Sequence, residues 1–269
     1  MADFGAVARV TTVGTGLLSF AAGMAVATLT TPVGISGAVF LLPIQLSLLG
    51  VPSPAVTPTN LLFNVVSIPG ALARYRRHAP LRSTLTTVLL IGTLPGVILG
   101  AIVRVLVIPG PQLFRLLVAG LLLPLGIWLC LRTFQTPSPR PQTQLSNSCI
   151  VTLAFGVGVV GGIYGIGGGS LLSPILVGRG FSLSTVAPAA LTSTLLTSVA
   201  GAATYLVLAI TTAGDHIAPY WMIGLMAGLG GLCGGYLGAY LQPHLPERML
   251  RGALGITAIA TAVVYATQS

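Results

Sequence analysis

The chain contains one short glycine-rich segment twice, and this duplication constrains the fold more than any other feature. The segment at 34–44 reads GISGAVFLLPI, and it returns 131 residues later at 165–175 as GIGGGSLLSPI, with six of eleven positions identical. The likeness continues with an offset of 130 residues at Val56 and Val186, Pro58 and Pro188, Leu61 and Leu191, and Tyr75 and Tyr205. The chain is therefore predicted to consist of two related halves.

The amino-acid composition indicates the environment in which these halves fold. Of 269 residues, 54% are hydrophobic, 6% are charged and only three are acidic. A soluble domain of this length needs far more polar surface. We therefore expect an all-α polytopic protein that spans the lipid bilayer of the cell (inner) membrane several times. The net charge of +9 comes from Arg that lie mainly between apolar runs, so we expect no nucleic-acid partner.

Apolar runs long enough to cross about 30 Å of hydrocarbon as helices follow each glycine-rich segment. They cover 84–107, 112–131, 185–210, 218–241 and 250–266, and 56–73 is slightly shorter. The glycine-rich segments themselves interrupt apolar stretches, because 10–29 continues as 39–49 and 150–163 continues as 171–177. These pieces are typical of broken or re-entrant helices, which a membrane tolerates where protein or a watery cavity satisfies the backbone.

The expected organisation is two repeats, each with a broken or re-entrant segment followed by three transmembrane helices. An N-terminal repeat covers 1–132 and a C-terminal repeat covers 149–269. A polar linker at 133–148, which contains three prolines, joins them.

The arginines favour an inverted relation between the repeats. The loop at 74–82 carries four Arg and should be cytoplasmic, whereas the equivalent loop at 211–217 carries none. An odd number of crossings in each repeat would place these loops on opposite sides, and a parallel arrangement is the less favoured alternative. Arg104 and Arg115 then lie on the side opposite to most other Arg, where they can either snorkel or attract an anion.

Both glycine-rich segments are candidate binding sites for an anion. Glycine permits a positive φ and the close approach of a solute, and an interrupted helix leaves backbone N–H groups free. Segments broken at equivalent places are typical of transporter sites, and helix packing or a hinge is the alternative role. The candidate residues are Thr31, Gly34, Ser36 and Gly37 in the first half, and Gly165, Gly167, Gly168, Gly169 and Ser170 in the second.

A second polar group lies in the helices that follow. Asn60 and Asn64 are four residues apart and share a helix face, where they either line a solute path or hold helices together. Thr59 precedes them as a further candidate. Thr192 and Ser193 lie in the matching stretch of the second half, where hydrogen bonding within the helix is the favoured role.

Glycines at four-residue spacing form a third pattern. Gly96 and Gly100 are one such pair, and Gly230, Gly234 and Gly238 extend it in the second half. Small residues at this spacing let helices approach closely. We expect these faces to pack helices and to be available for a homo-oligomer.

Catalytic and metal chemistry have little support. The three acids, Asp3, Asp215 and Glu247, lie at the terminus or in loops, and no Ser has a His and an acid placed to activate it. The His and Cys residues are not spaced as metal ligands, and no nucleotide-binding motif is present. We therefore expect a protein that is not an enzyme and uses no cofactor or metal.

The order of these motifs resembles the sulfite exporter TauE/SafE family of membrane permeases. The likeness covers nearly the whole chain and rests on GIGGGS at 165–170, TPTNLLFNVVSIPG at 57–70 and the spaced Pro43 and Pro174. The resemblance implies a secondary transporter for a small anion: sulfite, a sulfonate, sulfoacetate or a related organic anion. The alternative is an anion channel, or a membrane receptor or structural protein of the same architecture.

Overall fold

A computed structural model of the chain describes residues 2–77, 83–108, 110–134, 146–179, 181–211, 217–244 and 247–267, apart from the side chains of 2–12, 132, 134 and 247. These residues form helices, joined by short turns, and contain no strand. In chain order the elements are α1 (Ala2–Thr30), the 3-10 helix η1 (Thr31–Val33), α2 (Ala38–Ser47), α3 (Val56–Tyr75), α4 (Thr84–Leu106), α5 (Pro111–Phe134), α6 (Asn147–Tyr164), α7 (Leu172–Gly178), α8 (Leu183–Thr211), α9 (Trp221–Leu241), η2 (Gln242–His244) and α10 (Glu247–Thr267).

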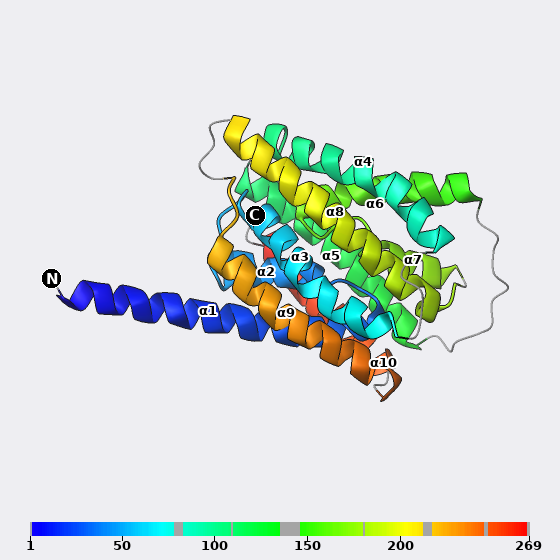
Figure 1. Ribbon diagram of the computed structural model, residues 1–269, viewed down its shortest axis with the longest axis horizontal. Helices are drawn as coiled ribbons and strands as arrows, with labels where there is room; N and C mark the ends of the chain where they lie inside the picture. Colours follow the sequence, from blue (N-terminus) through cyan, green and yellow to red (C-terminus); the bar gives the residue numbers. More distant parts are fainter. Residues whose placement is uncertain are drawn as a thin grey trace.

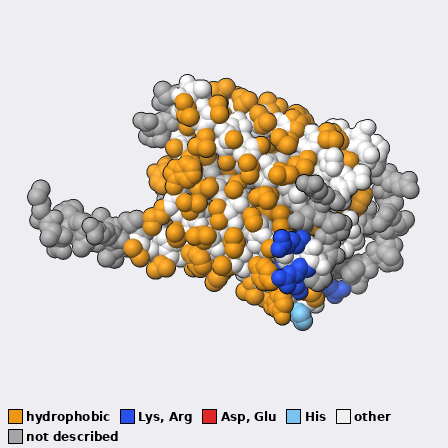
Figure 2. Space-filling view, in the orientation of Figure 1, with side chains coloured by type: hydrophobic (Ala, Val, Ile, Leu, Met, Phe, Trp, Pro, Cys, Tyr) orange, Lys and Arg blue, Asp and Glu red, His pale blue; other side chains and the backbone are white. Residues whose placement is uncertain are grey.

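Eight of the described helices are long and apolar enough to cross a membrane: α1, α3, α4, α5, α6, α8, α9 and α10. Hydrophobic side chains are spread over the whole described part of the face shown in Figure 2, as lipid-facing helices require. The predicted all-α polytopic membrane protein is confirmed. Each predicted apolar run corresponds to one of these helices, with ends that differ by a few residues.

The first glycine-rich segment interrupts a helix, as predicted. α1 ends at Thr30, and η1 leads to Gly34, whose φ of +76° ends the helical winding. Only glycine adopts this left-handed conformation readily. The chain then turns back as α2, which begins after Gly37. Residues 31–37 are called the first break below.

The second glycine-rich segment has the same construction. α6 ends at Tyr164, and Gly165 and Gly167 adopt φ values of +72° and +74° before α7 begins. Residues 165–171 are called the second break. At the junction of the two halves, α5 continues to Phe134 and α6 begins at Asn147, so helices extend into both ends of the predicted linker.

Glycines bring α4 and α6 into close contact. A Cβ at Gly92, Gly96 or Gly100 would lie 2.1 to 2.4 Å from a backbone oxygen of α6. The three oxygens belong to Val151, Phe155 and Val159, in that order. Both helices advance by four residues at each contact, so they run in the same direction with their turns in register.

The same construction joins α9 to α1. A Cβ at Gly230, Gly234 or Gly238 would lie 1.9 to 2.6 Å from a backbone oxygen of α1. These oxygens belong to Phe20, Met24 and Thr28, in that order. The glycine faces predicted to pack helices are therefore occupied within the chain, and a homo-oligomer would need other faces.

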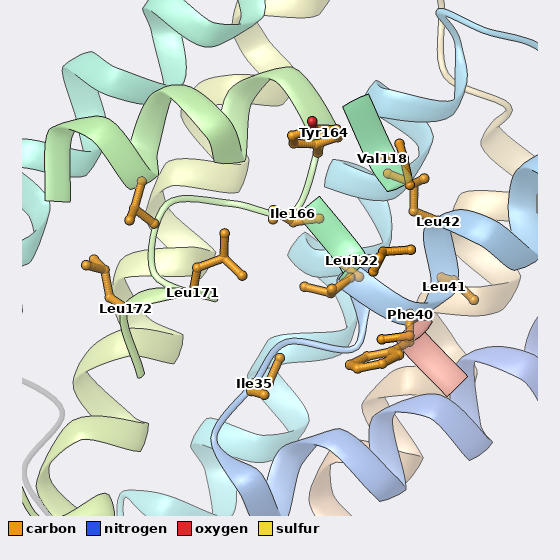
Figure 3. Packing of buried hydrophobic residues seen from close by; sticks show 14 of the residues in the cluster. Ile35, Phe40, Leu41, Leu42, Val118, Leu122, Tyr164, Ile166, Leu171 and Leu172 are labelled. Carbon is orange, nitrogen blue, oxygen red and sulfur yellow. The ribbon is translucent and has the colours of Figure 1, made fainter. Parts of the chain in front are cut away.

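The remaining helices surround the two breaks. α3 packs on α8 and α9, α4 packs on α8, and α5 packs on α10. Figure 1 shows these long helices side by side, with the shorter α2 toward the left of the bundle and α7 toward the right. Figure 3 shows the core at the breaks, where Ile35 and Ile166 lie among buried apolar side chains such as Leu122 of α5.

One end of the molecule is basic. Figure 2 shows Arg side chains and a His gathered at the end where α9 meets α10. Arg74, Arg76 and Arg77 lie at the end of α3, and Arg74 lies over the ring of Tyr240 of α9, with 5.1 Å from its Cζ to the ring centroid. α1 begins far from this end, on the left of Figure 1.

Candidate functional site

The first break is held by hydrogen bonds to one backbone oxygen. The Gly34 N–H donates to the Thr31 oxygen over 2.9 Å, and the Tyr75 hydroxyl donates to the same oxygen over 3.2 Å. Thr31 and Gly34 are both buried. A side chain of α3 thus supplies a hydrogen bond that the continuing helix would otherwise have made.

Two asparagines of α3 face the chain at the first break. The Ser36 hydroxyl donates to Asn64 Oδ1 over 2.6 Å, and Asn60 Nδ2 donates to the Ala38 oxygen over 2.9 Å. All three side chains are buried, yet Asn60 Oδ1 and Asn64 Nδ2 have no partner among the described residues. Buried polar atoms are nearly always hydrogen-bonded, so these two atoms are available to a solute.

A small cavity adjoins the first break. Its volume is about 10 Å³, which is about the space that one water molecule needs. Three predicted site residues, Thr31, Ser36 and Gly37, line it together with Ser67 of α3. Leu191 of α8 also lines it, so both halves of the chain contribute to its wall.

The second break uses its polar groups within the chain. The Gly168 N–H donates to Thr197 Oγ1 over 2.9 Å, and the Ser170 hydroxyl donates to the Ile166 oxygen. The Tyr205 hydroxyl donates over 2.9 Å to the oxygen of Gly162, in the last turn of α6. Two of the donors that the sequence suggested for an anion at this break, the Gly168 N–H and the Ser170 hydroxyl, are therefore engaged within the chain.

The four glycines of the second break are closely surrounded. A Cβ on any of them would lie 2.0 to 2.6 Å from another part of the chain. For Gly165, Gly167, Gly168 and Gly169 in turn, the nearest atoms are the Thr57 oxygen, Thr194 Cγ2, Thr93 Cβ and the Ala190 oxygen. Close packing against α3, α4 and α8 therefore accounts for glycine at all four positions.

Two predicted residues lie apart from the breaks. Thr59 donates to the Ala55 oxygen over 2.7 Å and accepts the Tyr220 N–H over 2.9 Å, so it joins α3 to the start of α9. Thr192 is half-buried and donates to the Pro188 oxygen of its own helix over 2.7 Å. These contacts are structural.

Ser193 lies near the second break. Its hydroxyl lies 3.0 Å from the hydroxyl of Thr93 of α4. A Cβ added at Gly168 would lie 2.4 Å from the Cβ of the same threonine. Thr93 was not among the predicted site residues, and no repeated motif or polar cluster in the sequence marks it.

The second half of the chain reaches the first break through Ser173 of α7. A Cβ at Gly34 would lie 2.7 Å from the Ser173 hydroxyl, which is buried and has no partner among the described residues. Ser198 of α8 is likewise buried and unpartnered, and it lies against Gly167. The two breaks are therefore parts of one polar region.

Several of these hydroxyl residues were not predicted, although the sequence contains a signal for some of them. Thr197 and Ser198 follow Ser193 by one helical turn. Ser67 corresponds to Thr197 through the 130-residue offset that also relates the two tyrosines. Hydroxyl and amide groups of this kind can donate hydrogen bonds to an anion and do not ionise near neutral pH.

A protein-family model described as Sulfite exporter TauE/SafE matches residues 19–265. The matched region includes both breaks and the last residues of α10 up to 265. No curated protein and no solved structure matches the chain.

Proposed function

Because the chain belongs to the sulfite exporter TauE/SafE family, we propose that this multi-pass membrane protein is a secondary transporter that binds its substrate at the first break. Its proposed substrate is a small sulfur-containing anion, such as sulfite, a sulfonate or sulfoacetate, or a related organic anion. Members of the family are transporters and not enzymes, and the uncharged polar groups at the breaks agree with binding rather than catalysis.

The observation that carries this proposal is the set of unpartnered polar atoms around the first break. Asn64 Nδ2 and the Ser173 hydroxyl can both donate hydrogen bonds to the oxygens of an anion. Asn60 Oδ1 can accept one from a protonated substrate or a water. Ser36, which donates to Asn64, and Thr31 line the small cavity at the same break. These five residues form the proposed substrate site, and the second break forms its opposite wall.

We further infer that the two halves are inverted repeats. α5 and α10 occupy equivalent places in the two halves. Gly126 of α5 lies against Ile259 of α10, and Gly252 of α10 lies against Thr133 of α5. Along this contact the residue numbers of α5 increase while those of α10 decrease, so the two helices are antiparallel. Two copies related by an axis in the membrane plane must run in opposite directions, so this packing supports inversion.

Hydrogen bonds at the breaks support the same inference. Tyr75 donates to the oxygen of Thr31, and the equivalent Tyr205 donates to the oxygen of Gly162. Gly162 is itself the equivalent of Thr31 through the 131-residue offset. The repeats thus share a bond as well as a sequence motif.

A carrier fits this structure better than a channel does. A channel needs a continuous polar path, whereas a cavity of about 10 Å³ is too small for sulfite. Ile35, which lines this cavity, and Ile166 of the second break are almost fully buried. Movement of one repeat against the other would have to open the site, as in carriers with alternating access.

Flux into liposomes tests the transport function. Purified protein in proteoliposomes should take up radiolabelled sulfite with saturation, and preloaded unlabelled sulfite should accelerate the uptake by counterflow. A conductance that does not saturate would identify a channel instead. Failure to move sulfite, sulfonates or carboxylates would favour a receptor or a structural protein.

Substitutions locate the site within that assay. Asn64→Ala removes a donor from the anion, so we expect a loss of affinity of about tenfold to a hundredfold, the usual effect of a hydrogen bond to a charged group. Thr192→Ala is the matched control, because this polar residue of a membrane helix bonds only within its own helix in the described structure. Equal affinity in both variants would place the substrate elsewhere.

A further inference from the structure

Arg104, near the end of α4, is the largest fully buried side chain in the described part of the protein, with an exposed fraction of 0%. Arginine keeps its charge in proteins, and an isolated charge is very unfavourable in an apolar interior. The side chain does not snorkel to the surface, which was one of the two roles expected for it. Its burial therefore needs a different explanation.

The described contacts of Arg104 are all uncharged. Nη1 donates to the Ile108 oxygen, and Nη2 donates to the Ser53 hydroxyl. The guanidinium lies over the ring of Phe114, with 4.1 Å from Cζ to the ring centroid. Nε is buried and has no partner among the described residues. One nitrogen of the group thus has no partner, and the group has no counterion among the described residues.

The register of α4 and α6 places this charge at the second break. Gly92, Gly96 and Gly100 meet α6 at positions 151, 155 and 159. One further turn of both helices pairs Arg104 with position 163, next to the end of α6. Phe114 agrees with this placement, because its ring lies 5.8 Å from the ring of Tyr164, the last residue of α6.

The other half of the chain provides a check on this extrapolation. Gly230, Gly234 and Gly238 meet α1 at positions 20, 24 and 28, so the next turn pairs Gln242 with position 32. This contact is present, since Gln242 Nε2 donates to the Pro32 oxygen over 3.1 Å. Equivalent positions therefore carry an uncharged amide at the first break and a guanidinium at the second.

We propose that Arg104 is an anion-binding residue, whose guanidinium binds a small oxyanion at the second break through Nε and Nη2. Two adjacent N–H groups of arginine match two oxygens of a sulfite, sulfonate or carboxylate group. The Ser53 hydroxyl, now bonded to Nη2, would share that group with the ligand. This inference rests on the proposed transport of an anion, and it adds a charged contact at the second break, which forms the wall opposite the uncharged groups of the first break.

A purely structural role is the rival explanation. Arg104 bonds the backbone beyond α4, and a cation near the last turn of α6 would favour the negative end of that helix. Asp215 is a second rival, because it is an acid in the segment between α8 and α9, outside the described residues. The experiment must separate these roles from anion binding.

The test measures sulfite binding to the purified full-length protein in detergent, by calorimetry at constant ionic strength. Arg104→Gln should raise the Kd for sulfite at least tenfold, and Arg104→Lys should raise it less, because it keeps the charge and loses the paired donors. Arg115→Gln is the matched control, since this half-buried Arg lies at the same end of the molecule and its loss changes the net charge equally. Its Kd should stay within about twofold of the parent value, as expected for a more distant and screened charge.

Thermal unfolding without sulfite provides the second readout. The inference would be overturned if Arg104→Gln binds sulfite with the Kd of the parent protein. If the Gln variant does not fold, the same result in Arg104→Lys would overturn it. A result that points to an ion pair with Asp215 would also overturn the inference. In that case Asp215→Asn lowers the melting temperature as much as Arg104→Gln, the double variant lowers it no further, and sulfite binding is unchanged in all three variants. If the parent protein binds neither sulfite nor any sulfonate or carboxylate, the proposed function fails as well. If the parent protein binds sulfite and the Arg104 variant binds it equally well, only the role of Arg104 is overturned.

Discussion

Single side chains complete the backbone where the helices are interrupted. Tyr75 donates to the oxygen of Thr31, at the start of the first break, and Tyr205 donates to the oxygen of Gly162, just before the second break. Both tyrosines are buried, and their aromatic rings fill space between helices while the hydroxyl reaches the backbone. A break in a membrane helix is stable only where such partners exist, because lipid offers none.

Removal of one of these hydroxyls should measurably weaken the fold. Tyr205→Phe leaves the Gly162 oxygen without its donor, and we expect a loss of about 1 kcal/mol of stability, within the range for hydrogen bonds between membrane helices. Thermal unfolding in detergent measures the effect. Tyr236→Phe is the control, because this tyrosine is exposed on α9 and should leave the melting temperature unchanged. Equal melting temperatures for both variants would show that the bond contributes nothing.

The sequence predicted the polar residues of the site only in part. Asn60 and Thr59 are adjacent, yet Asn60 faces Ala38 at the first break while Thr59 bonds Tyr220 at the start of α9. Helical periodicity gives the angle between two side chains, and it does not tell which neighbouring helix each one meets. The orientation of α3 against its neighbours, which no short motif encodes, decides the role of each residue.

At the scale of elements, glycine spacing lets two pairs of helices pack closely. α4 fits α6 and α9 fits α1 because glycines at every fourth position let backbones touch. The sequence predicted both the interrupted helices and the close packing, since both depend on local spacing. It did not predict the partners, because any smooth glycine face can in principle accept several helices.

Two alanine substitutions on facing helices test this pairing. Gly100→Ala places a Cβ 2.1 Å from the Val159 oxygen, so the helices must separate, with an expected loss of about 1–3 kcal/mol. Gly156→Ala on α6 meets nothing within 4 Å, and it should be neutral or stabilise by up to about 1 kcal/mol through helix propensity. Expression level and melting temperature check both variants. A stable Gly100→Ala protein would contradict the packing described for α4 and α6.

At the scale of the whole molecule, charge distribution gives the orientation in the membrane. Arg76 and Arg77 are exposed at the end of α3, and Arg179 and Arg248 are exposed elsewhere in the chain. Arginine-rich loops remain in the cytoplasm, so the basic end should face inward. The overall fold class was predictable for the same reason, because hydropathy and charge act over whole segments and need no knowledge of individual contacts.

Labelling of introduced cysteines checks the orientation. In a variant without the three native cysteines, Arg77→Cys should be protected from an impermeant thiol reagent added to intact cells, because its side chain lies on the cytoplasmic side. Ala218→Cys, exposed just before α9, should react. The reverse pattern would show that the orientation in the membrane is opposite to the expected one. Reaction at both positions would contradict the expected number of crossings.

Arg104 and Gln242 occupy equivalent positions in the two halves but differ in charge, and this difference has an electrical consequence. With a monovalent anion bound, the guanidinium and its ligand cancel, whereas the empty protein keeps one positive charge at the second break. A membrane potential would then act on the return of the empty carrier, by about 2.3 kcal/mol for a full charge moved through 100 mV, and leave the loaded step unaffected. A divalent anion would leave a net charge of −1 on the loaded carrier, so the potential would act on both steps. The voltage dependence of transport would therefore reveal the charge of the ion that is carried.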